Sequence, residues 1–147
     1  MTDHLGDARS SRLGLRNAVG LVERSLAAPA SGRADAWAKD LAAELELLGV
    51  AIEQHIDLTE APDGLLEDIV RQEPRLAKRV ERTRAEHETL RETLARTLAA
   101  VPKDGKNVDV HHARDLVVEL LTGVVRHRHL GADLVYEAYN VDMEAGD

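Results

Sequence analysis

The stretch VHHARDLVVELLTGVVRHRHLGADLVYEAYNV, residues 110–141, decides the fold class of this chain. Steps of three and four along it reach the residues Ala113, Val117, Leu120, Val124, His127, Gly131, Leu134, Ala138 and Val141. This spacing of small and apolar residues is typical of the buried stripe of a long amphipathic helix. His127 interrupts the stripe, and a buried imidazole is costly unless it hydrogen-bonds or ligates a metal. The stretch therefore predicts a helix whose histidine needs a partner inside the protein.

Three other segments repeat this periodicity, and they are residues 11–28, 33–60 and 74–101. Ser10 or Ser11 is expected to cap the first of these helices, Ser31 the second, and Asn107 or Asp109 to start the helix of the opening stretch. Pro74 suits the first turn of the third. Between the second and third segments, residues 65–71 predict a short additional helix.

The chain is predicted to be all-α, because Leu, Ala and Val supply its apolar content and no segment alternates as a strand does. Four long helices with short connections indicate a single up-down-up-down four-helix bundle, with a short extra helix between the second and third. The expected division is a flexible N-terminus at 1–10, the bundle at 11–141 and a tail at 142–147.

Composition excludes several classes of function. The net charge of -8, with no dense Lys or Arg stripe, argues against nucleic acid and anionic membranes as partners. The chain has no cysteine, which excludes disulfides, thiolate metal sites and iron–sulfur clusters. No apolar run reaches the roughly 18 residues of a membrane span, and the N-terminus lacks a signal peptide. A cytoplasmic location is therefore expected.

Two further helices carry a histidine within the buried stripe, as the opening stretch does. His55 interrupts the stripe of residues 33–60, and His87 that of residues 74–101. In the predicted topology these two and His127 lie at similar depth, so all three imidazoles can converge inside the bundle. Three neutral imidazoles make a site for a first-row transition metal. The alternative is that each histidine is a structural hydrogen-bonding residue, and spacing alone does not choose between the two.

Three runs of the sequence resemble the hemerythrin-like HHE domain family, and they are IEQHIDLTEAPDGLLEDIV, RLAKRVERTRAEHETLRETL and LLTGVVRHRHLGADLVYEAY. The resemblance covers about residues 12–140. It implies a non-haem di-iron centre that binds oxygen or handles iron, peroxide or nitric oxide. It also implies that His55, His87 and His127 are metal ligands.

The chain departs from the family pattern at three places. The family has a histidine on its first helix, and the stripe of residues 11–28 has none. Where the family places carboxylates, one turn after two of the histidines, this chain has Thr59 and Gly131. Glu60 and Asp133 are the carboxylates nearest to these positions, and they are candidate metal ligands. The space beside the small residues suits a ligand pocket, a one-metal site completed by water, or a side chain from the first helix.

Carboxylates beside the histidines have a second interpretation. Glu86, next to His87, and Asp133 are candidates to accept a hydrogen bond from a metal-bound imidazole and so orient it. An exposed salt bridge is the alternative for both.

The sequence predicts a small non-haem metal-binding protein with one or two iron ions and an incomplete ligand set. Its expected role is the sensing of O2, NO or peroxide, or iron handling. The sequence has no nucleophile–base arrangement, phosphate loop or nucleotide motif, so no catalytic residue is assigned and a non-enzymatic role is favoured. The alternative is a metal-free bundle that acts as a ligand-binding or protein-interaction module. A third interpretation is a self-associating bundle, a homo-oligomer without a ligand.

Overall fold

The computed structural model describes residues 3–140, and within this range every regular element is a helix. The elements are α1 (His4–Ala27), α2 (Ala34–Glu60), α3 (Leu65–Gln72), the 3-10 turn η1 (Pro74–Leu76), α4 (Ala77–Ala100) and α5 (Val110–Tyr139). The prediction of an all-α chain is confirmed. None of the helices in the described range is both long enough and apolar enough to cross a membrane.

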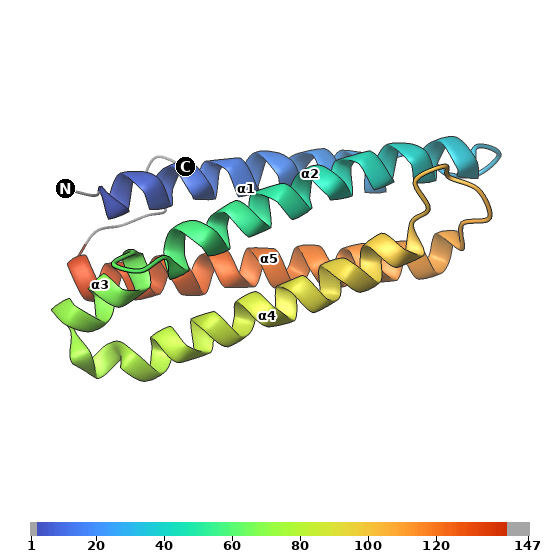
Figure 1. Ribbon diagram of the computed structural model, residues 1–147. Helices are drawn as coiled ribbons and strands as arrows, with labels where there is room; N and C mark the ends of the chain where they lie inside the picture. The colour runs from blue at the N-terminus through green and yellow to red at the C-terminus, as the bar shows by residue number, and fades with distance from the viewer. Residues whose placement is uncertain (1–2, 141–147) are drawn as a thin grey trace.

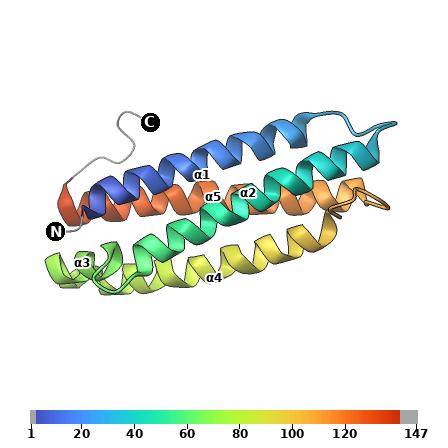
Figure 2. The same cartoon turned by 45° about the horizontal axis from the view of Figure 1, so that its top comes forward.

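The long helices lie side by side, and each runs back along the one before it (Figure 1). α1 packs most closely on α2, and α4 on α5. The short helix α3 lies at one end of the molecule, near the start of α1 and the last turns of α5 (Figure 2). This arrangement places α3 over one end of the interior between the long helices.

The start of the first helix differs from the prediction. α1 begins at His4 rather than near residue 11, and the carboxylate of Asp3 caps it by accepting a hydrogen bond from the backbone N–H of Gly6 at 2.8 Å. The extension is stable because Leu5 and Ala8 pack against apolar residues of α3 and α5. Ser11 therefore lies inside the helix, on a face directed at α2, and is not a cap.

The other helix ends follow the sequence signals in part. The residue before α2 is Arg33, and its side chain makes no capping hydrogen bond, so the prediction of Ser31 as the cap is wrong. Asp109 caps α5 as predicted, since its carboxylate accepts a hydrogen bond from the backbone N–H of His112 at 3.1 Å. α5 ends at Asn140, whose φ of 56° is the left-handed conformation typical of helix ends. Val141 and the predicted tail at 142–147 lie outside the described residues.

The buried apolar side chains form two separate clusters. The larger cluster lies between the four long helices, and its members include Trp37, Leu41, Leu45, Leu48, Ile52, Leu90, Val117, Leu120 and Val124. The smaller cluster lies at the α3 end, and it consists of Ala8, Leu65, Leu66, Ile69, Leu76, Val80, Ala132, Leu134 and Val135. Along α4, His87 lies between the residues of the two clusters, and along α5 His127 does the same. A polar layer therefore separates the two apolar regions.

Candidate metal centre

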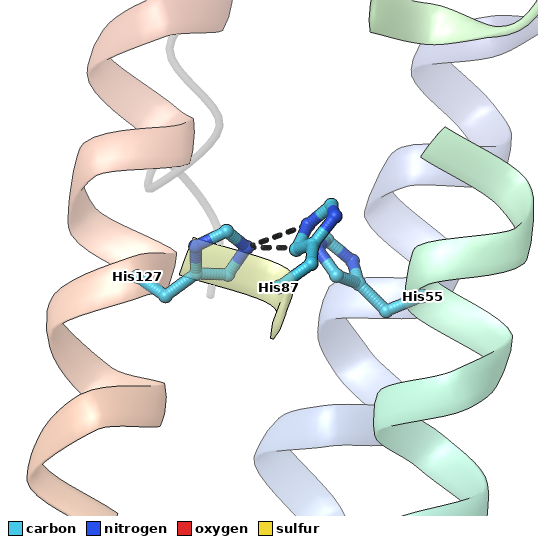
Figure 3. A group of neighbouring side chains, drawn as sticks. All are labelled: His55, His87 and His127. Atoms are coloured by element: carbon cyan, nitrogen blue, oxygen red, sulfur yellow. Dashed lines mark hydrogen bonds between the residues drawn. The ribbon is translucent and has the colours of Figure 1, made fainter. Parts of the chain in front are cut away.

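Three histidines from three helices meet inside the bundle. His55 comes from α2, His87 from α4 and His127 from α5, and their rings point toward one another (Figure 3). The Nε2 atom of His127 lies 3.1 Å from Nε2 of His55 and 3.2 Å from Nε2 of His87. One ligand nitrogen from each of the three lies within 4.8 Å of the others. The expected convergence of these side chains is therefore observed.

The opposite nitrogen of each ring, Nδ1, is held by a side chain from another helix. His55 shares a hydrogen bond of 3.0 Å with the hydroxyl of Ser11 on α1. His127 Nδ1 lies 2.7 Å from a carboxylate oxygen of Glu86 on α4. His87 Nδ1 is hydrogen-bonded to Glu60 at the end of α2. Because a carboxylate accepts, both imidazoles carry a proton on Nδ1, and in the neutral form each directs an unprotonated Nε2 at the centre.

This arrangement directs nitrogen lone pairs at one another where the Nε2 atoms meet. Two Nε2 lone pairs that face each other at 3.2 Å repel unless a proton or a metal ion lies between them. A tetrahedral metal ion with bonds of about 2.0–2.1 Å holds its nitrogen ligands about 3.3–3.4 Å apart. The two measured Nε2 separations are close to that value. The geometry at His127 is thus compatible with ligands of one metal ion, and the three ligand nitrogens all lie within 4.8 Å of one another.

The protein environment keeps the imidazoles in the form that binds metals. Burial, with further contributions from His127, His87 and Arg12, lowers the pKa of His55 to about 3. Burial also lowers the pKa of His87, although its hydrogen bond to Glu60 acts in the opposite direction. Both rings are therefore neutral near pH 7, which leaves nitrogen lone pairs for a cation.

The two carboxylates considered as ligands lie away from the point where the Nε2 atoms meet. Glu60 hydrogen-bonds the far side of the His87 ring and forms an ion pair of 3.2 Å with Arg84. Asp133 is exposed, and the structure does not bring it to the histidines. The six residues from His127 to Asp133 turn the helix by about 240°, which directs the carboxylate outward. Glu86 orients His127 rather than its neighbour His87.

The side chains present do not fit a centre of two iron ions. Two closely spaced cations need bridging anions to offset their repulsion. Thr59 and Gly131 stand where the resemblance noted in the sequence implies carboxylates, and Glu60 is engaged elsewhere. Within residues 3–140, the three histidines are the group able to hold a metal. This donor set fits one ion.

A cavity of about 40 Å³ adjoins the three histidines. Thr59 and Gly131 line it, so the space expected beside these small residues exists. Arg12 of α1 also lines it, and its guanidinium donates a hydrogen bond of 3.1 Å to the carbonyl of Arg128. Most of the remaining wall is apolar, made by Ala8, Leu65, Leu66, Ile69, Ala132, Leu134 and Val135. The volume suits about two or three water-sized groups.

Sequence reasoning found the three histidines and missed two of the side chains that orient them. The sequence predicts Ser10 or Ser11 as a helix cap, yet Ser11 faces His55 across the α1–α2 contact. Glu60 was considered as a ligand rather than as the acceptor for His87. Their roles depend on how neighbouring helices are rotated against each other, and a single helix pattern does not contain that information.

No protein-family model, no curated protein and no solved structure matches this chain. Its function is therefore inferred from the geometry of this centre.

Proposed function

We propose that this chain is a metal-binding protein that holds one first-row transition metal ion through Nε2 of His55, His87 and His127. The observation that carries the proposal is the pair of Nε2 separations at His127, 3.1 and 3.2 Å. The carboxylates on Nδ1 of His87 and His127 strengthen it, because they direct the unprotonated nitrogens to the centre. Metal-bound histidines usually have such an acceptor on the other ring nitrogen.

Non-haem iron is the metal that the resemblance to hemerythrin-like domains implies, and three neutral nitrogen donors also suit zinc. Three protein ligands leave a coordination position for a small molecule, and the cavity beside the histidines supports this reading. Our proposal is therefore the binding of O2, NO or peroxide for sensing, or the handling of iron, without a catalytic residue. An up-down-up-down four-helix bundle with α3 as the extra helix, in the cytoplasm, is the proposed setting.

A second candidate is a metal-free hemerythrin-like bundle that acts as a ligand-binding or interaction module. Two observations favour it: Thr59 and Gly131 replace the expected carboxylates, and Arg12 extends from α1 to the cavity. In this case the hydrogen bonds among the three rings would have a purely structural role.

Metal content separates the two candidates. The protein is purified without metal-affinity resin, loaded under anaerobic conditions with Fe(II) or separately with Zn(II), and freed of excess metal. Mass spectrometry is expected to find about one ion per chain. A metal at 100 times its dissociation constant should also raise the free energy of unfolding by about 2.7 kcal/mol.

The matched variants are His55→Ala, His87→Ala and His127→Ala, with His129→Ala as the control. His129 is exposed on the same helix as His127, so its removal should leave metal content unchanged. Each of the other three should lose most of the bound ion. A well-folded parent protein without metal would reject the proposal in favour of the metal-free module. Two ions per chain would show that the one-ion assignment is wrong.

A further inference from the structure

Two hollows of the molecule share part of their wall. The first is the cavity beside the histidines. The second opens at the surface between the start of α1 and the turn from α2 to α3, where His4, Asp7, Leu58 and Pro62 line it. Ala8, Thr59 and Leu65 line both hollows. These three side chains therefore lie between the solvent and the cavity.

The shared wall is made of side chains from three different helices. Ala8 comes from α1, Thr59 from α2 and Leu65 from α3, and they retain 6%, 4% and 7% exposure. Ala8 contributes a single methyl group. Small side-chain movements at this three-helix junction can therefore open a passage without breaking a helix.

We propose that small uncharged molecules reach the histidine centre through the junction of Ala8, Thr59 and Leu65. This inference rests on the proposed metal site, since it names the route by which its ligand arrives. The cavity volume of about 40 Å³ limits the ligand to roughly two or three heavy atoms.

The chemistry of the junction selects against charge. Two of its members are apolar, and the hydroxyl of Thr59 already donates to the carbonyl of His55 at 2.8 Å. An ion that crosses the junction loses its water without a charged group there to replace it. For an uncharged diatomic molecule the free energy of desolvation is small.

A competing route lies on the other side of the centre. A surface hollow between α4 and α5 is lined by Glu86, Thr89, Gly123 and His127. It reaches the Nδ1 side of the His127 ring, where Glu86 is already hydrogen-bonded. A molecule arriving there meets the wrong nitrogen and a carboxylate. The α1–α3 side is therefore the better route to Nε2.

The test measures how fast nitric oxide binds to the Fe(II)-loaded protein, by stopped-flow absorbance under anaerobic conditions. Ala8→Phe should slow association at least tenfold, because the ring fills the junction, and Leu65→Ala should speed it several-fold. Dissociation should change in the same direction in each, because the ligand leaves by the same route. Thr89→Phe places a ring of the same size in the competing hollow and should leave the rates unchanged.

Metal content, measured on each sample first, separates the two proposals. A parent protein without bound iron rejects the metal site and this route with it. Equal iron in all proteins, with unchanged rates in both Ala8→Phe and Leu65→Ala, rejects the route alone. Slower binding in Thr89→Phe would place the route between α4 and α5 instead. Leu65→Ala shortens a side chain and keeps the test decisive if Ala8→Phe fails to fold.

Discussion

Glu60 and Glu86 determine how two of the three imidazoles are presented. Each accepts a hydrogen bond from an Nδ1–H group and comes from a helix different from that of its histidine. Both carboxylates are partly exposed, with 26% and 32% of their side-chain surface accessible. They therefore remain in contact with solvent while the rings they hold are buried. The rings of His87 and His127 owe their orientation to these two residues.

We expect Glu60→Gln and Glu86→Gln each to weaken metal binding about 10–100-fold, because an amide acceptor is neutral and orients the imidazole less firmly. Competition with a chelator of known affinity measures this. Glu88→Gln is the control, since Glu88 lies beside His87 in sequence but pairs with Arg91 on the surface. Equal affinity in all three variants would contradict an orienting role for Glu60 and Glu86.

Two glycines should respond to alanine in opposite ways. Gly131 lies within α5, and a Cβ atom added there meets nothing within 4 Å. Gly131→Ala should stabilise the metal-free protein by about 0.5–1 kcal/mol, since glycine is costly inside a helix. Gly105 has a φ of 76°, and a Cβ there would lie 2.0 Å from the carbonyl oxygen of Asp35. Gly105→Ala should destabilise by about 1–3 kcal/mol.

Urea unfolding measures both changes. Destabilisation by Gly131→Ala would mean that the space beside this residue is smaller than the structure indicates.

At the scale of the helices, the sequence predicts where the long elements run but not always where they begin. The stripe of residues 33–60 ends where α2 ends, because Pro62 and Gly64 follow it at once. The start of α1 was missed, because serines that resemble a cap precede the strongest part of the stripe. Leu5 and Ala8 add only a weak pattern, and they become helical through contacts with residues distant in the sequence.

Besides their apolar packing, α3 and α5 share a polar contact in which the hydroxyl of Tyr139 donates to the carboxylate of Asp68. This hydrogen bond is the main reason why the pKa of Asp68 lies below its usual value of 3.8. A hydrogen bond from Arg71 lowers the pKa further. The bond from Tyr139 therefore stabilises the fold above pH 3.8, and its contribution is lost as the pH falls through the lowered pKa.

Tyr139→Phe should accordingly destabilise the protein by about 1 kcal/mol at pH 7 and by less at a pH below the lowered pKa of Asp68. Urea unfolding of parent and variant at both pH values provides the comparison. A difference of equal size at the two pH values would show that the lost hydroxyl acts by packing and not through ionised Asp68.

For the whole molecule, the histidine positions were predictable because each imidazole breaks an apolar stripe in its own helix. Their convergence followed from the order and direction of the helices. The choice among a ligand pocket, a one-metal site and a side chain from the first helix was not predictable, nor was the position of Arg12 beside the cavity. They depend on which face each long side chain occupies after packing, as Glu60 and Asp133 show.

The layer of imidazoles between the two apolar clusters affects how the protein unfolds locally. Polar rings contribute little hydrophobic attraction, so without metal the two clusters are weakly coupled. Amide hydrogens of α3 and of the first turns of α1 should exchange with deuterium through partial opening. They should then exchange faster than amides around Leu41 and Leu120. Equal protection in the two regions would instead indicate one cooperative unit.

A metal ion bound by α2, α4 and α5 would join the two regions across this layer. Loading should therefore slow exchange at the α3 end more than in the larger cluster. Loss of the metal would leave a chain that stays folded at one end and opens often at the other. Metal supply would then govern how readily a protease cuts this chain, as well as what it binds.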